Sequence, residues 1–363
     1  MNPNPKYRTV PEAESGAISA LRLPLAILVV FIHTPYFDSV SSLIISRNLA
    51  AVAVPGFFMI SAYLLFAKDR EWNWRIYKGK LKSRLSSLLL PYVFWNIVAL
   101  IVRFARQLVR EYVFHKQANT KLVVNYDLND WLDAFGLLPA ATDWPRPGMW
   151  GLGLPMDFPL WYMRDLMLVV LISPLLSWII NRGKHWLVPF LIAGFVFPES
   201  IWPMNAHLKY LWIFILGGYI GRYQTAFLSV LRKFFPVVLG VWAISFAAAF
   251  LWPFLLPVAV LSGICVAVGL ASFVRLSRET LERAGGFAFF LYAVHAVIKF
   301  PISLLYEKLD FSGELAYWSY AVLLIGIACC AFCILSHCGS VVAMFCFGRR
   351  IAHGNVRRDQ MCS

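Results

Sequence analysis

The sequence predicts an all-α fold, a polytopic membrane helix bundle of about ten transmembrane helices with both termini cytoplasmic. Of its 363 residues, 60% are hydrophobic and 14% are charged, and the mean hydropathy is +0.66. An ordinary soluble domain carries about a quarter charged residues. Apolar runs recur from residue 17 to residue 348, and many approach the length of about 20 residues that crosses a bilayer as a helix. The membrane part is therefore nearly the whole chain.

Ten apolar runs define the candidate spans. Each is placed to within a few residues, at 17–36, 48–67, 86–105, 158–180, 186–201, 207–222, 235–251, 253–274, 285–302 and 318–338. They predict one membrane domain over 17–348, a cytoplasmic tail over 1–16, an extracytoplasmic loop at about 106–157 and a basic cytoplasmic tail over 349–363. No clear small-residue cleavage site accompanies the first run, so we expect a retained helix rather than a signal peptide.

The basic charge of the chain indicates its orientation. The net charge is +14 and the pI is about 9.6, which in a soluble protein would suggest nucleic acid. Here Lys and Arg gather in alternate short connections, a pattern that marks the cytoplasmic side. We therefore expect membrane lipids, and no nucleic acid, as partners. The seven cysteines lack metal-ligand spacing, so we predict no metal site and no bound cofactor.

Two ionisable residues in the first span are the leading functional candidates. Charged side chains inside a span persist mainly where they line a cavity or meet a partner. Arg22 and His33 are eleven residues apart, which is three helical turns plus about 20° and about 16 Å along the axis. They therefore share one helix face, and we expect them to face a common cavity. A neutral imidazole can act as a base, while a guanidinium can hold a phosphate or carbonyl.

Each of these residues has a structural alternative. Arg22 lies about one turn inside the predicted cytoplasmic boundary, where a long basic side chain can extend its charge to the interface. His33 could be a packed histidine bonded to a backbone carbonyl. If the protein were a membrane scaffold in which polar residues only hold helices together, both Arg22 and His33 would have these structural roles.

Further stretches of sequence carry a family resemblance. Residues 55–63 read Pro-Gly-Phe-Phe-Met-Ile-Ser-Ala-Tyr, residues 159–166 read Pro-Leu-Trp-Tyr-Met-Arg-Asp-Leu, and residues 291–295 read Leu-Tyr-Ala-Val-His. Together with Arg, ten residues and then His in the first helix, they resemble the bacterial membrane acyltransferase 3 family over nearly the full length. Ala62 stands where that family usually has glycine. The site candidates that these stretches add are Phe58, Ser61, Trp161, Tyr162, Arg164 and His295.

The resemblance implies transfer of an acyl group, usually acetyl, from a cytoplasmic coenzyme A thioester to a sugar hydroxyl of the cell envelope. The donor acyl-CoA would be a co-substrate, and the acceptor a sugar, polysaccharide or lipid-linked glycan. The resemblance also implies the bacterial inner membrane as location. Direct attack by the hydroxyl and a short-lived acyl-histidine are both open routes. The acceptor sugar, the acyl chain, the membrane face of the chemistry and the oligomeric state are not fixed by the sequence.

A basic cluster after the second span is a candidate donor site. The family has Arg-X-X-Arg in this connection, and Arg84 matches the first member, whereas Ser87 stands at the second. Lys80 and Lys82 could supply the missing charge for the phosphates of coenzyme A. The positive-inside rule explains the same residues without any ligand, so both interpretations remain open.

The polar residues of later spans also have two interpretations each. Asp165 could orient the His33 imidazole as a carboxylate partner, or Arg164 and Asp165 could lock helices together. His295, with Lys299 one turn beyond on the same face, could pack helices or contact the acceptor sugar.

The long loop and one rival function complete the predictions. The aromatic stretch 144–150 could bind sugar rings or form an interfacial Trp belt. The rival is a multi-helix transporter or flippase of a lipid-linked sugar, which also needs embedded charges. Such folds commonly show internal repeats, and no clear repeat is present here.

Overall fold

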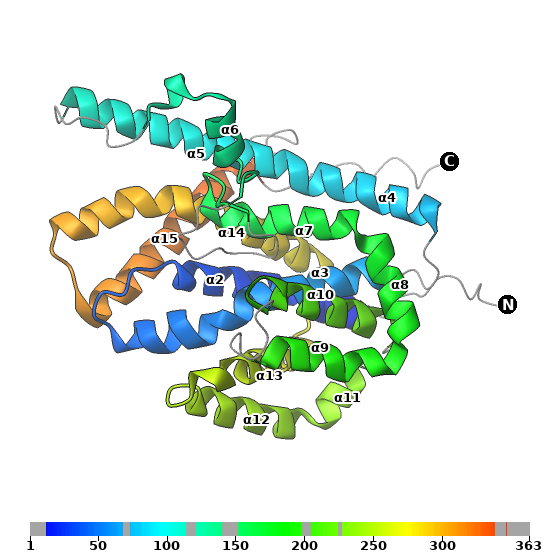
Figure 1. The fold of residues 1–363 in the computed structure, drawn as a ribbon. Coiled ribbons are helices and arrows are strands. Elements are labelled where there is room, and N and C mark those ends of the chain that lie inside the picture. Colours follow the sequence, from blue (N-terminus) through cyan, green and yellow to red (C-terminus); the bar gives the residue numbers. More distant parts are fainter. Residues whose placement is uncertain are drawn as a thin grey trace, which may run out of the picture.

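The computed structural model confirms the all-α prediction (Figure 1). The structure describes residues 12–67, 73–113, 121–139, 152–197, 205–223, 227–337 and 346. Within these ranges there is no β-strand, and the only extended pairing is an isolated bridge between Pro139 and Leu152. The two predicted tails and the aromatic stretch 144–150 lie wholly or mostly outside the described residues.

The helices follow one another with short connections. In the first half they are α1 (Glu12–Ala20), α2 (Arg22–Ile32), α3 (Ala53–Phe66), α4 (Trp74–Arg84), α5 (Leu90–Leu108), α6 (Leu128–Ala134) and α7 (Trp161–Leu171). In the second half they are α8 (Ser173–Gly183), α9 (Leu187–Val196), α10 (Asn205–Tyr223), α11 (Phe227–Lys233), α12 (Phe235–Ala248), α13 (Leu256–Phe273), α14 (Arg278–Lys308) and α15 (Gly313–Ser336). Segments Ser42–Leu49, Leu85–Leu89 and Val109–Val113 are π-helical, and 3-10 turns lie at Ala50–Val52, Val123–Asn125, Phe158–Leu160, Lys184–Trp186 and Pro253–Leu255.

Fewer helices than predicted are long and apolar enough to cross a bilayer unbroken. Five qualify among the described residues, namely Ser42–Phe66, Trp74–Leu108, Pro253–Phe273, Arg278–Lys308 and Gly313–Ser336. Two bent pairs raise the number to seven, and Gly16–Ile32 is a shorter apolar helix. The total of ten spans stays a prediction.

One predicted span is bent, and another begins at a bend. The span expected over 158–180 is interrupted at Ile172, and the helices on either side form an angle of 67°. Pro174 stands in the first turn of α8, where its missing N–H and fixed φ favour a new helix start. The span expected over 235–251 corresponds to α12, which has Pro236 in its first turn and meets the preceding α11 at 75°. Proline thus sets both bends.

The centre of the bundle is built around α2 (Figure 1). This helix packs against α14 and α3, and α14 also packs against α15. Helix α3 lies closely against α10, where Gly217 and Gly221 are four residues apart. A side chain at Gly217 would collide with the Met59 carbonyl, and a Cβ at Gly221 would lie 2.7 Å from the Tyr63 oxygen. The two glycines therefore allow the backbones to touch, as small residues do in membrane helices.

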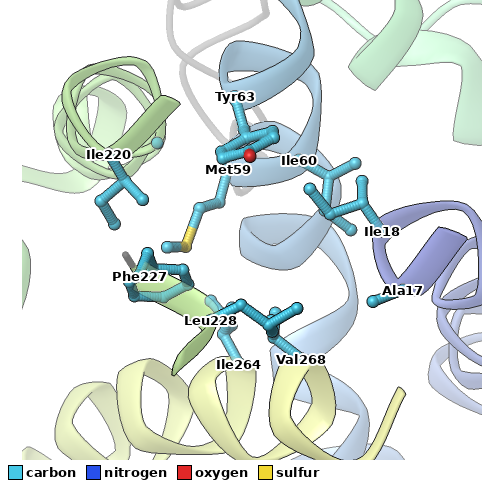
Figure 2. A pocket seen from close by; sticks show the side chains of 11 residues that line it. Ala17, Ile18, Met59, Ile60, Tyr63, Ile220, Phe227, Leu228, Ile264 and Val268 are labelled. Carbon is cyan, nitrogen blue, oxygen red and sulfur yellow. The ribbon is translucent and has the colours of Figure 1, made fainter. Parts of the chain in front are cut away.

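A small cavity lies beside this contact, among α1, α3, α10, α11 and α13, with about 460 Å³ of space free of protein atoms when its opening is included (Figure 2). Met59 and Tyr63 point into it from α3, and Phe227 closes it from α11. Its lining is apolar except for the Tyr63 hydroxyl. It therefore offers room for hydrocarbon and no groups for proton transfer.

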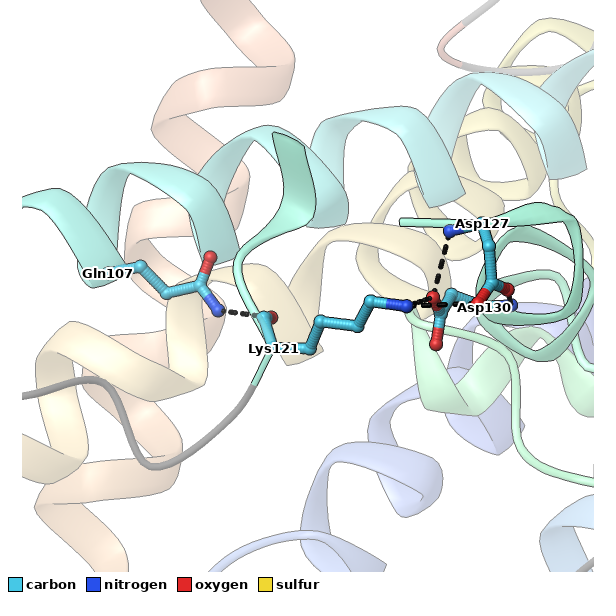
Figure 3. A network of polar contacts seen from close by, with 4 residues as sticks. All are labelled: Gln107, Lys121, Asp127 and Asp130. Atoms are coloured by element: carbon cyan, nitrogen blue, oxygen red, sulfur yellow. Dashed lines mark hydrogen bonds and ion pairs between the residues drawn. The ribbon is translucent and has the colours of Figure 1, made fainter. Parts of the chain in front are cut away.

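The described part of the predicted extracytoplasmic loop is held by a polar network (Figure 3). Asp127 and Asp130 form a reciprocal cap of α6, each carboxylate accepting the other's backbone N–H at 3.0 and 2.9 Å. The Lys121 ammonium binds both carboxylates, and Gln107 of α5 donates to the Lys121 carbonyl at 3.0 Å. The backbone N–H of Asp130, followed by Lys121, lowers the pKa of Asp127. The carboxylates of Asp130 and then Asp127 raise the pKa of Lys121.

Candidate active site

Two histidines from distant parts of the chain stack on each other. His33 directly follows the last turn of α2, and its ring lies 5.3 Å from that of His295 on α14, with an angle of 17° between the planes. The edge of the Phe158 ring contacts His33 at 4.7 Å between centroids. His33 is half-buried and its ring has no hydrogen bond to any other described residue, whereas His295 is fully buried. The two predicted histidine candidates therefore form one unit, here called the histidine pair.

The surroundings of His295 fix its tautomer. Its Nδ1 lies 2.8 Å from the Tyr292 carbonyl oxygen and 3.2 Å from that of Leu291. Because a carbonyl only accepts, Nδ1 carries the hydrogen and Nε2 carries the lone pair. This Nε2 is buried without a hydrogen-bond partner in the described structure. Buried polar atoms are nearly always bonded, so an unbonded imidazole nitrogen marks a place for a substrate hydroxyl or a water.

Arg22 and Arg84 line one cavity, here called the Arg84 cavity. It encloses about 940 Å³ of space free of protein atoms, part of it at its open mouth. Its polar lining residues are Arg22, Ser61, Arg84, Ser87, Tyr162 and Tyr292. The predicted anion clamp and the first member of the basic pair are thus brought together. Ser87, which stands where a second arginine is usual, faces the same space.

The Arg84 cavity does not reach His33 in this structure. Tyr162 and Tyr292 line the cavity, and the ring of Tyr292 lies 6.4 Å from that of His295. The Tyr292 hydroxyl donates to the Pro159 carbonyl, which ties α14 to the turn before α7. The expectation of a single space shared by Arg22 and His33 is therefore not met. Tyr292 lies between the cavity and the histidine pair.

The second-span motif contributes to packing and to the cavity wall. The Ser61 hydroxyl lies 2.9 Å from the Tyr162 hydroxyl, which donates to the Phe57 carbonyl at 3.2 Å. Phe58 is fully buried and meets the edge of Tyr162 at 4.6 Å. Trp161 is buried beside it, with its ring 6.4 Å away. Of these candidates, only Ser61 and Tyr162 face the Arg84 cavity.

Arg164 and Asp165 form a buried ion pair. The Arg164 Nε and Nη2 atoms donate to one Asp165 oxygen at 3.1 and 2.9 Å, and the side chains are 3% and 0% exposed. Arg164 Nη1 also donates to the carbonyls of Gly136 and Gly153, at 2.7 and 2.5 Å. The pair thus joins α7 to the loop, which supports the interpretation as a structural lock. An orienting role of Asp165 toward His33 stays a prediction.

The lysines after the second span lie elsewhere. Lys80 donates to the Leu65 carbonyl at the end of α3, and Lys82 is exposed. Neither is among the lining residues of the Arg84 cavity. Their contact with the donor stays a prediction, and any such contact would lie outside the Arg84 cavity.

A second polar cavity lies beside Phe158, whose ring contacts His33, although neither histidine is among its lining residues. This Arg103 cavity encloses about 860 Å³ of space free of protein atoms, part of it at its open mouth, and it is lined by Arg103 and Arg106 of α5, by Lys299 of α14, and by Asp157 and Phe158. Asn96 accepts the backbone N–H of Asp157 at 3.1 Å and so fixes this turn. Sequence reasoning missed Arg103, Asp157 and Asn96 as site residues, although each lies in or next to a predicted span, where polar residues are suspect.

Two stacked imidazoles lie next to residues of two cation-lined cavities, Tyr292 in one and Phe158 in the other, and a base beside space for an anion is suited to transfer of a group between substrates. A family model described as an acyltransferase domain matches residues 15–337. The chain belongs to this acyltransferase family. Together with its apolar helices, this makes it a multi-pass membrane protein. The resemblance seen in the motifs is confirmed, and an acyltransferase is favoured over a transporter.

The chain is also similar to the succinoglycan biosynthesis protein ExoH of Rhizobium meliloti (strain 1021). The two are 25% identical over 333 residues, which cover 84% of this chain and 82% of that protein. No solved structure matches the chain significantly.

Proposed function

We propose that this protein moves an acyl group, acetyl in the simplest case, from a coenzyme A thioester to a hydroxyl of an envelope sugar or polysaccharide. It would act in the bacterial cytoplasmic membrane with both termini on the cytoplasmic side. The observation that carries the proposal is the stacked histidine pair, in which His33 contacts Phe158 of the Arg103 cavity and His295 lies beside Tyr292 of the Arg84 cavity. Membership of the acyltransferase family and the similarity to a succinoglycan biosynthesis protein support it.

The Arg84 cavity suits the donor. Guanidinium groups bind phosphate oxygens with charge-assisted hydrogen bonds, and Arg22 and Arg84 present two guanidiniums to one open space. A bound thioester would extend its acyl end past Tyr162 toward the histidine pair. Since Tyr292 closes that path, the acyl end advances only when the Tyr292 ring moves aside.

The histidine pair suits the proton transfer. His33 takes the proton of the acceptor hydroxyl as the hydroxyl oxygen attacks the carbonyl carbon of the thioester. The carbon–sulfur bond then breaks, and the leaving thiolate takes the proton back from His33, so that an ester and free coenzyme A result. The stacked His295 ring presents its π-face to the imidazolium formed on His33. His295 is therefore a positioning residue, and His33 is the base.

The test uses the full chain in lipid nanodiscs with labelled acetyl coenzyme A and isolated envelope polysaccharide. We expect label in the polysaccharide and release of free coenzyme A. His33→Ala should lower this rate by about 10²- to 10⁴-fold, the usual contribution of general base catalysis. His337→Ala is the matched control, because His337 is exposed at the end of α15 and lines neither cavity. Unchanged turnover by a correctly inserted His33→Ala protein would rule out the assignment.

A further inference from the structure

We infer that the Arg103 cavity binds an anionic group, a carboxylate or a phosphate, carried by the acceptor glycan. The inference rests on the proposed function for its meaning, but anion binding can be measured without any donor. Three basic side chains and one acidic side chain line the cavity, from α5, α14 and the turn before α7. The cavity thus has a net positive lining next to the proposed base.

Arg103 is the strongest sign of a missing anion. Its Nε is buried without a hydrogen-bond partner among the described residues. Its Nη1 has only the Met156 sulfur, at 3.8 Å, which is a weak acceptor. Guanidinium donors removed from water normally bind carboxylate, phosphate or carbonyl oxygen, because leaving them unbonded costs free energy. Arg103 is half-buried and lines the cavity, so an oxyanion there would supply the side chain with the acceptor that the described residues do not.

Lys299 and Arg106 place further positive charge around the same space. Lys299 is half-buried, with its ammonium 6.0 Å from the centre of the Phe158 ring. Arg106 is exposed at the mouth, with its guanidinium over the Phe300 ring at 3.2 Å. The charges therefore run from the opening inward, an arrangement that draws in an anion.

Phe158 links this cavity to the chemistry. One edge of the Phe158 ring contacts His33, and its face lies under Lys299. An anionic substituent held by Arg103 and Lys299 would therefore keep the rest of its sugar beside Phe158, the residue whose ring contacts the base. Held in this way, a neighbouring hydroxyl is oriented for proton removal, and the reaction gains from a fixed geometry.

Asp157 indicates that the ligand carries hydroxyl groups in addition to its anionic group. Both of its carboxylate oxygens are buried and without a hydrogen-bond partner in the described structure. A carboxylate would repel an anion but accepts hydrogen bonds from hydroxyl groups. The cavity therefore suits a molecule that carries both an anionic group and free hydroxyls, such as an acidic sugar or a sugar phosphate.

The experiment measures binding to the full chain in nanodiscs by calorimetry, with no acyl donor present. The probes are D-glucuronate, D-glucose as the neutral match, and glucose 1-phosphate. We expect either anion to bind at least about tenfold more tightly than glucose, and salt to weaken that binding. Tighter binding of glucuronate would identify a sugar carboxylate as the group recognised, and tighter binding of glucose 1-phosphate would identify a phosphate.

Substitutions locate the binding. Arg103→Gln should weaken anion binding by about tenfold or more while leaving glucose unchanged. Arg283→Gln is the control, because Arg283 is exposed and paired with Glu279 on α14 at 2.7 Å. If the Arg103→Gln protein does not insert into nanodiscs, Lys299→Gln tests anion binding at the same cavity. Equal binding of anions and glucose, or anion binding unchanged in both variants, would overturn the inference. Anion binding without any acyl transfer would instead overturn the proposed function alone.

Discussion

Two polar pairs of this bundle differ in how their hydrogen bonds are used. In the Arg164–Asp165 pair, Arg164 has oxygen acceptors in Asp165, Gly136 and Gly153. In the histidine pair, Nε2 of His295 has no partner in the described structure, and the His33 ring is held only by ring contacts. A satisfied pair stabilises the fold, whereas an unsatisfied one is available for a substrate. The predictions test whether this division holds.

The largest effect should come from the histidine pair. His295→Ala should lower acyl transfer by about 10²-fold or more without preventing insertion, since the ring supports the base. His295→Asn can still donate from its side-chain amide to the Tyr292 carbonyl, but it has no ring to stack. We therefore expect it to be as inactive as His295→Ala. Restored activity in His295→Asn, measured by release of coenzyme A, would make His295 a packing residue only.

The Arg164–Asp165 pair should instead govern stability. Arg164→Leu leaves a buried carboxylate uncompensated, which costs about 3–5 kcal/mol. We expect loss of folded protein in detergent, measured by thermal denaturation, with exposed Arg182→Gln as the control. Asp165→Asn separates the two interpretations of this residue. A fall in turnover with unchanged stability would favour the orienting role toward His33. It would contradict the conclusion that the Arg164–Asp165 pair only stabilises the fold.

Substitution of Gly136, whose carbonyl accepts a hydrogen bond from Arg164, should destabilise the protein less than the loss of Arg164. Its φ is +58°, and a Cβ there would lie 2.7 Å from Arg164 Nη1. Gly136→Ala should therefore destabilise the protein by about 1–3 kcal/mol. Gly240→Ala on α12 is the matched control, because a Cβ there meets nothing within 4 Å. In a helix that change should be neutral or stabilising by up to about 1 kcal/mol. Equal melting temperatures for the two variants would contradict the role of Gly136.

The smallest effect concerns the exposed cap of α6. The lowered pKa of Asp127 means that its stabilisation is present above the ordinary value of 3.8 and is lost as pH falls below it. The raised pKa of Lys121 means that its stabilisation is present below 10.5 and is lost at higher pH. Hydrogen exchange of the α6 amides should therefore be protected equally at pH 6 and pH 8 after correction for intrinsic rates. Protection that changed between these two values would show another titrating group at the cap.

The sequence predicted the all-α class because hydrophobic length is a local property, whereas the ten spans expected exceed the five to seven that the described helices support. Charge and motif alone named Arg22 and Arg84 as site candidates, and the structure places both on one cavity. The bend at Ile172 was not predicted, because the apolar run over 158–180 is continuous across Pro174. The stacking of His33 on His295 depends on α2 packing against α14, which no local pattern reports.

Other features of the site depend on contacts between distant segments. Tyr292 belonged to a recognised motif, but its position between Arg22 and His33 follows from its bond to the Pro159 carbonyl. Asp165 looked equally suited to His33 and to Arg164, and only the fold brings it onto Arg164. Arg103 lies inside the predicted span 86–105 and was not named as a candidate, because only the fold of α5 against α14 and the turn before α7 brings it to a cavity.

The closure made by Tyr292 has a consequence for the order of events in the proposed reaction. With Tyr292 bonded to Pro159 and the rings of Phe158 and the histidines packed behind it, aromatic carbon lies between the Arg84 cavity and the Arg103 cavity. Aromatic carbon offers no polar atoms along which a proton or an ion could pass. In the proposed reaction the acyl end crosses this barrier, so the bond between Tyr292 and Pro159 must break and form again in each turnover for the two cavities to stay separate.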